Sequence, residues 1–118
     1  IPKLHNKYLQ ILSKENLLLK KLKFQYKELY KLKFQYFDGT LDDEELKKRN
    51  WEPQPLRILK DKIPMYIDAD NEIIELNLKI AAQEEKVEIL NSILKTIANM
   101  NWNIRNAIEH LKFINGII

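Results

Sequence analysis

The chain of 118 residues has no cysteine, two glycines and four prolines, and no apolar run near the ~20 residues that cross a bilayer. The missing cysteine excludes disulfides and thiolate metal sites. Gly39 and Gly116 are too few for a phosphate-binding glycine loop. His5 and His110 have no second ligand at metal-binding spacing. We therefore predict no metal, no cofactor and no enzyme activity, and the same absences favour a reducing, intracellular setting.

What is abundant is charge, unevenly distributed. Lys and Arg number 20 against 17 acidic residues, a net charge of +3. Residues 1–37 hold nine Lys against two Glu, which is +7, and the remainder hold 11 basic and 15 acidic residues, which is −4. This asymmetry indicates either a polyanion partner for the first segment or complementarity between a basic and an acidic helix. Composition alone does not separate the two.

A hexapeptide, Lys-Leu-Lys-Phe-Gln-Tyr, occurs at 21–26 and again at 31–36. Ten residues make close to three helical turns, so both copies lie on nearly the same side of one helix. Lysines for phosphates and rings for bases are the chemistry of a sequence-tolerant single-stranded nucleic-acid site. Opposite the apolar stripe of this helix we place Lys20, Lys23, Phe24, Lys27, Lys31 and Phe34. Lys33 lies at the edge of the apolar face, and Phe37 lies on that face, where it either stacks on a base or joins the core.

The spacing of apolar residues predicts an all-α fold. Two long helices, about 3–37 and 64–99, are joined by a short helix 41–49 and a linker containing Pro53 and Pro55. Gly39 ends the first helix, whose stripe has polar slots at Glu15 and Gln25. A break at 99–101 precedes a last helix 102–115. We expect one domain over 1–118, with the natural N-terminus trimmed before Ile1.

The acidic sequence Asp68-x-Asp70-x-Glu72 lacks the central Gly and closing Glu of a calcium loop. We interpret it as helix-start acids and solvated surface.

Wide apolar faces on two long helices predict subunits that complete one another's core. The C-terminal end is densely apolar, which is typical of a surface with a partner. The residues that we expect to mediate self-association are Trp102, Ile104, Ile108, Leu111 and Phe113. Two other interpretations remain open: a structural coiled-coil adaptor that binds no nucleic acid, and a helix that lies on a membrane surface.

Two stretches carry a resemblance to a known family. The first is KLKFQYFDG at 31–39, with its basic-x-basic, hydrophobic, polar, two-aromatic, x, Gly pattern. The second is WNIRN at 102–106 running on to FING at 113–116. With the acidic short helix and the Trp-x-Pro linker between them in order, the chain resembles the UvsY family of phage recombination mediators.

The resemblance implies a non-enzymatic protein that forms a ring-like homo-oligomer, a hexamer or heptamer, and binds single-stranded DNA. Such a protein acts in the cytoplasm of the infected bacterial host, where it helps a UvsX-type recombinase displace the phage single-strand binding protein. The DNA-contacting basic pair maps onto Lys31 and Lys33, and the assembly helix onto 102–116. Lys33 replaces Arg, which gives up the planar fork for phosphate, and Phe37 replaces Tyr, which removes a hydroxyl.

Overall fold

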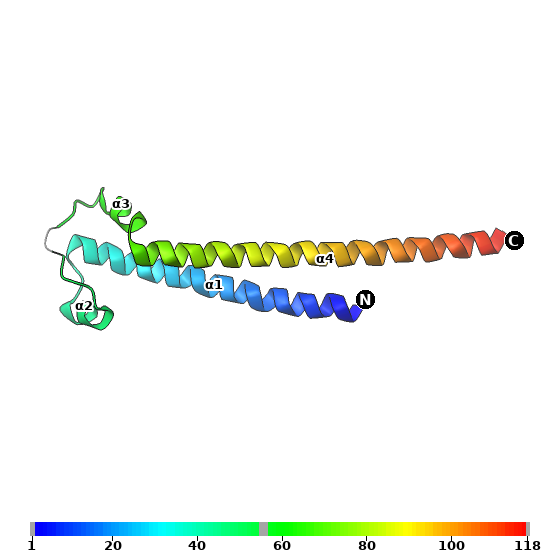
Figure 1. Cartoon of the computed structure of the whole chain (residues 1–118), viewed down its shortest axis with the longest axis horizontal. Helices are drawn as coiled ribbons and strands as arrows, with labels where there is room; N and C mark the ends of the chain where they lie inside the picture. The colour runs from blue at the N-terminus through cyan, green and yellow to red at the C-terminus, as the bar shows by residue number, and fades with distance from the viewer. Residues whose placement is uncertain (1, 55–56, 118) are drawn as a thin grey trace. The chain divides into compact units, whose positions relative to one another are not determined.

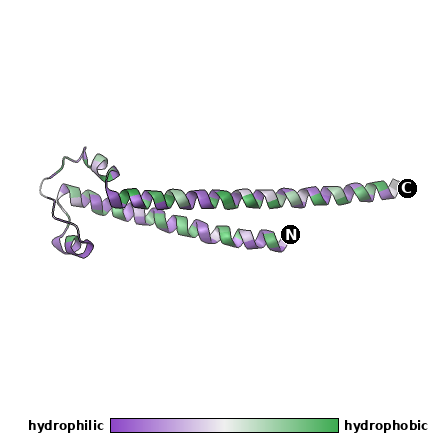
Figure 2. Cartoon of the chain, viewed as in Figure 1, coloured by the Kyte–Doolittle hydropathy of each residue, from purple (hydrophilic) through white to green (hydrophobic). Residues whose placement is uncertain are grey.

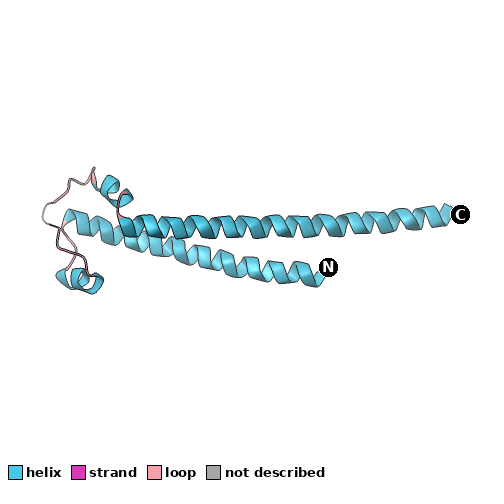
Figure 3. Cartoon of the chain, viewed as in Figure 1, coloured by secondary structure: helices cyan, strands magenta, loops and turns pink. Residues whose placement is uncertain are grey.

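The structure, a computed structural model, describes residues 2–54 and 57–117. Its helices in chain order are α1 (Pro2–Asp38), α2 (Asp43–Arg49), α3 (Ile63–Asp68) and α4 (Asn71–Ile117) (Figure 1). No residue in the described ranges lies in a strand (Figure 3). The predicted all-α class is confirmed, whereas the ring-like oligomer stays a prediction.

The end of α1 agrees with its predicted stop at Gly39. Gly39 has φ 82°, its N–H donates to the Tyr36 carbonyl at 3.3 Å, and the Thr40 N–H donates to the Gln35 carbonyl at 3.0 Å. These two bonds form a Schellman turn, in which glycine takes the left-handed conformation without a Cβ penalty. The chain therefore leaves α1 sharply and enters α2.

The predicted helix 64–99 is wrong at its start. Pro64 lies in α3, which ends at Asp68, and α4 begins separately at Asn71. The carboxylate of Asp70 accepts a hydrogen bond from the Ile73 N–H at 3.2 Å. Aspartate in this position satisfies an otherwise unpaired N–H of the first turn. Asp70 thus caps a separate helix that begins at Asn71, whereas the sequence pattern predicted it within the first turns of a helix beginning near Pro64.

The predicted break at 99–101 and the separate helix 102–115 are also wrong, because α4 continues through both. Asparagine costs a helix only ~0.7 kcal/mol relative to alanine, and no glycine or proline interrupts the segment. The three- and four-residue spacing of Leu94, Ile97, Met100 and Ile104 also continues across it. A local preference this weak does not end a helix of 47 residues.

The chain divides into two compact units. The terminal unit is Ile1–Leu18 with Gln83–Ile118, and the central unit is Leu19–Ala82. Apolar and polar positions alternate along the long helices in both units (Figure 2). The expectation of a single domain stays a prediction.

The central unit has its core where α1 ends and α4 begins. Ile63, Ile67 and Ile73 are fully buried, and Phe37 is 9% exposed. Fully burying a side chain of this size stabilises the fold by about 1.5–3 kcal/mol. The last turns of α1, all of α3 and the first turn of α4 are therefore held together by one apolar cluster. Partly buried around it are Tyr26, Leu29, Tyr30, Phe34, Tyr36 and Ile58.

The terminal unit is built differently, with a polar layer among buried apolar residues. The Gln83 side-chain amide donates to the Glu15 carbonyl at 2.9 Å and to its carboxylate at 2.6 Å. Lys86 Nζ lies 3.0 Å from the same carboxylate. We call Glu15, Gln83 and Lys86 the polar layer. The buried apolar residues of this unit are Leu12, Val87, Leu90 and Ile97.

Candidate nucleic-acid interface

Lysines on α1 form an exposed face in the central unit. Lys20, Lys23, Phe24, Lys27 and Lys31 follow one another at spacings of one to four residues and are all exposed. Residues three and four apart are neighbours on a helix surface. The sequence-predicted arc is therefore brought together on one side of α1, and we call these five residues the basic face.

Phe24 gives the basic face an aromatic surface. Its side chain is 63% exposed, and Lys27 Nζ lies 5.7 Å from the centre of its ring. An exposed phenylalanine among lysines offers a π-face for a base, and exposed lysines flank it on the same helix. Together they provide the charge and the stacking surface that sequence-tolerant single-strand binding uses.

The other two phenylalanines lie deeper. Phe34 is half-buried and packs against the central core, and Phe37 belongs to that core. Of the two alternatives open for Phe37, the core placement is the one observed. Stacking of Phe34 on a base stays a prediction.

Lys33 lies apart from the basic face, enclosed in the protein. The residue is only 4% exposed. Its Nζ lies 3.1 Å from Asp70 Oδ1 and 3.6 Å from Glu72 Oε1, and 3.9 Å from the centre of the Trp51 ring. We call Lys33, Trp51, Asp70 and Glu72 the Lys33 clasp. The predicted contact of Lys33 with DNA stays a prediction, and its ammonium here already has three partners.

Trp51 reaches the clasp because of the turn that ends α2. Asn50 has the left-handed conformation, φ 57° and ψ 34°, and the Trp51 N–H donates to the Leu46 carbonyl at 3.0 Å. This Schellman turn directs the indole back toward α4. Trp51 Nε1 then donates to Glu72 Oε1 at 2.6 Å.

Tyr36 closes the clasp from the α1 side. Its ring centre lies 5.4 Å from that of Trp51, and its hydroxyl donates to the Glu52 carbonyl at 2.5 Å. Burial raises the pKa of this hydroxyl, and the charges of Glu52 and Asp70 raise it further. The phenol therefore stays protonated and keeps its hydrogen bond at neutral pH.

Sequence reasoning found the basic face but missed the clasp. Asp70 does start a helix as expected, but its side chain is only 17% exposed, because it lies against Lys33. One signal was present in the sequence: Lys33 falls at the edge of the apolar stripe, where a cation needs a buried partner. The partners themselves lie 18 to 39 positions further along the chain, and the helical spacing around Lys33 does not indicate which residues they are.

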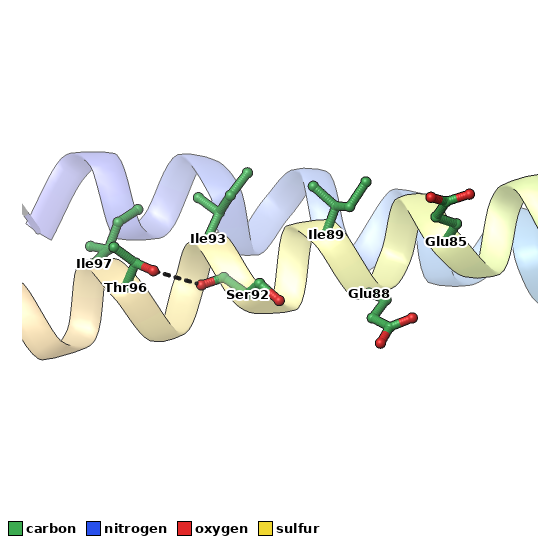
Figure 4. A pocket seen from close by; sticks show the side chains of 7 residues that line it. All are labelled: Glu85, Glu88, Ile89, Ser92, Ile93, Thr96 and Ile97. Atoms are coloured by element: carbon green, nitrogen blue, oxygen red, sulfur yellow. Dashed lines mark hydrogen bonds between the residues drawn. The ribbon is translucent and has the colours of Figure 1, made fainter.

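A groove on α4 in the terminal unit has an apolar floor (Figure 4). Its volume is ≈ 490 Å³, and Ile89, Ile93 and Ile97 line it at four-residue spacing. Thr96 donates its hydroxyl to the Ser92 carbonyl at 3.0 Å. The remaining lining residues are Glu85 and Glu88. The three isoleucine side chains of the groove offer a contact surface for an apolar partner.

The predicted assembly residues all lie on the exposed surface of the last turns of α4. Trp102 is 60% exposed and Phe113 67% exposed. Self-association through them stays a prediction. All five are large and exposed: Trp102, Ile104, Ile108, Leu111 and Phe113.

Two other classes of site are absent from residues 2–54 and 57–117. Neither long helix contains a segment apolar enough to span a bilayer, within the part of the chain that is described. Over the same residues, no three or more His, Asp or Glu side chains gather as a metal ion would require.

Comparison with known proteins gives one relationship. A protein-family model described as "Recombination, repair and ssDNA binding protein UvsY" matches residues 1–117. No curated protein and no solved structure matches the chain. The match spans both units, including the basic face and the last turns of α4. The chain belongs to the UvsY family of recombination, repair and single-stranded-DNA-binding proteins.

Proposed function

We propose that this protein is a recombination mediator that binds single-stranded DNA on its basic face. In this proposal it helps a UvsX-type recombinase displace the phage single-strand binding protein and begin a filament. It acts in the cytoplasm of the infected bacterial host, and it works through binding, with no catalysis of its own. Family membership supports the role in recombination and DNA binding; the named partners are our extension.

The observation that carries the proposal is the basic face itself. Four lysines project into solvent along about three turns of α1, with Phe24 between them. Exposed ammonium groups can reach phosphates without first being moved out of a buried environment. Each phosphate contact releases condensed counterions from the strand, which makes binding favourable and sensitive to salt. We assign Lys20, Lys23, Lys27 and Lys31 to the phosphates and Phe24 to base stacking, with Phe34 at the edge.

Assembly makes modest contacts sufficient. One basic face offers few phosphate contacts, but several copies in a homo-oligomer raise the effective concentration of the next face for the same strand. We propose a ring-like hexamer or heptamer that assembles through the exposed apolar residues of α4.

The DNA contact is tested by salt titration of Lys31→Ala. Binding of a fluorescent single-stranded oligonucleotide is measured by anisotropy across a range of salt concentrations. We expect weaker binding and a log–log salt slope that is flatter by about 0.7 for each subunit that engages the strand. The matched control is Lys95→Ala, an exposed lysine on α4 whose removal changes the net charge equally and leaves the basic face intact.

The outcomes separate the candidate functions. A wild-type protein without salt-dependent binding would favour the coiled-coil adaptor, for which the internal pairing of Lys33 with Asp70 is the supporting observation. Equal slopes for Lys31→Ala and Lys95→Ala would refute the assigned face. Recombinase filament formation on strands coated with single-strand binding protein then tests the mediator step with the same two variants. Anionic vesicles test the membrane interpretation.

A further inference from the structure

We infer that Lys33 is a positioning residue: it fastens the Trp51 linker and the start of α4 to α1, and so holds the basic face in place. This inference rests on the proposed DNA-binding function and concerns how that surface is maintained. It assigns different roles to the two lysines of the sequence Lys31-Leu32-Lys33.

Helix geometry places these two lysines on different sides of α1. Two positions along an α-helix correspond to a rotation of about 200°. Lys31 is accordingly exposed, whereas Lys33 is 4% exposed. A strand that runs along the basic face therefore meets Lys31 and does not meet Lys33.

The partners of Lys33 come from two other segments of the central unit. Asp70 precedes α4, Glu72 lies in its first turn, and Trp51 ends the α2 turn. The ammonium contacts both carboxylates and the indole face, while Glu72 also accepts the indole N–H. One cation thus connects three segments that are distant in sequence.

For Lys33, leaving Asp70, Glu72 and Trp51 in order to bind a DNA phosphate is unfavourable. If Lys33 left, the partly buried Asp70 carboxylate, 17% exposed, would lose its cation and keep only its hydrogen bond from the Ile73 N–H, and breaking an ion pair that is shielded from water is destabilising. The Trp51 ring would lose its cation–π contact, which is worth more when desolvated. A single solvent-exposed contact with a phosphate contributes less free energy than the contacts with Asp70, Glu72 and Trp51 that it would replace. Lys33 therefore remains in the clasp when the strand binds.

The deciding experiment compares Lys33→Met with Asp70→Asn in the full chain. Methionine keeps the side-chain length and removes the charge. Asparagine retains an oxygen for the Ile73 N–H but removes the carboxylate charge that Lys33 contacts. We expect both variants to weaken oligonucleotide binding by about tenfold, in the same direction, with the wild-type salt slope. Lys33→Arg, which keeps a cation for both carboxylates, restores most of the affinity.

The opposite role for Lys33 gives opposite results. If Lys33 bound phosphate, Lys33→Met would flatten the salt slope as Lys31→Ala does. Asp70→Asn would then tighten binding, because it frees the lysine from a competing carboxylate. Glu75→Gln, an exposed acid on α4, controls for the change in net charge.

A readout without DNA separates this inference from the proposed function. In a Trp102→Phe background, Trp51 is the remaining tryptophan. We expect Lys33→Met and Asp70→Asn to change its emission and to lower the urea midpoint of unfolding, followed by circular dichroism. If the wild type bound no DNA, the proposed function would fail while these signals still reported the clasp. Unchanged emission and midpoint in both variants would overturn the inference.

Discussion

Of the two glycines, Gly39 is the one with a positive φ. Its φ of 82° lies in the left-handed region, and a Cβ there would lie 3.5 Å from two side-chain atoms of Arg57, an ordinary contact. The cost of a side chain therefore comes from the backbone conformation. We expect Gly39→Ala to lower the free energy of unfolding by about 1–2 kcal/mol, measured by urea denaturation.

The other glycine supplies the matched control. Gly116 is helical, and a Cβ there meets nothing within 4 Å. Gly116→Ala should leave the free energy of unfolding unchanged or raise it by up to about 1 kcal/mol, since alanine is the better helix former. Equal effects at the two positions would contradict the conformational account of Gly39.

Individual side chains show where sequence reasoning succeeds. Gly39 was predicted correctly because glycine after an apolar helical repeat has few other structural roles. Lys31 was placed correctly because helical rotation fixes which side of α1 it occupies. The surroundings of Lys33 could not be predicted, because they depend on Trp51 and Asp70, which approach α1 only after the chain has reversed direction.

In the terminal unit, the polar layer sets how α1 and α4 are aligned along their lengths. Gln83 and Glu15 satisfy each other at one relative position of α1 and α4 in the terminal unit. A shift along the pair would place the amide and the carboxylate among apolar side chains, where an unpaired polar group is costly. Such polar positions within apolar seams specify register.

The polar layer makes the stability of the fold depend on pH: its contribution decreases as the solution becomes more acidic. The hydrogen bond from Gln83, and then Lys86, lowers the pKa of Glu15 below its usual 4.5. A carboxylate with a lowered pKa stabilises the fold at any pH above its pKa in the unfolded chain. This stabilisation is lost as the pH falls through its pKa in the folded protein. We expect wild type to exceed Glu15→Gln in thermal midpoint at pH 7, with the difference vanishing in strong acid.

The measurement is a thermal melt of both proteins from pH 7 down to about pH 2. Glu28→Gln, which alters an exposed acid on the same helix, serves as control and should show no comparable loss. A gap between wild type and Glu15→Gln that persists unchanged to the lowest pH would contradict the assignment.

Helix boundaries were predicted unevenly for identifiable reasons. The limits of α1 and α2 follow from Gly39 and from acidic residues at a helix start, which act locally. Asp70 was assigned to the first turns of a helix beginning near Pro64, because proline is common in a first turn and the local capping bond from the Ile73 N–H to Asp70 was not recognised. The supposed break at 99–101 gave too much weight to two asparagines within a continuous apolar repeat.

The exposed end of α4 gives a prediction about assembly. Ile104 and Ile108 are 44% and 48% exposed and lie on one side of the helix. Placing two carboxylates there should prevent close apolar packing between copies. We expect Ile104→Glu/Ile108→Glu to reduce the mass measured by sedimentation from a multiple of 14.2 kDa to that of one chain.

A matched variant adds the same charge elsewhere on these turns. Asn103→Glu/His110→Glu alters two exposed residues on another side of α4 and should keep the assembled mass. The measurement is repeated with an oligonucleotide, which we expect to stabilise the wild-type assembly. A wild-type protein of single-chain mass under both conditions would remove the proposed ring.

The alignment set by Gln83 and Glu15 has a consequence for exchange between copies. Gln83 contacts Glu15 at one fixed position along α1, and every copy of the chain carries the same two residues. The polar contact that disfavours sliding would therefore re-form if α1 were exchanged between identical molecules. In mixed assemblies of tagged and untagged protein, exchanged helices would then take the same alignment of α1 with α4 as in the unmixed protein.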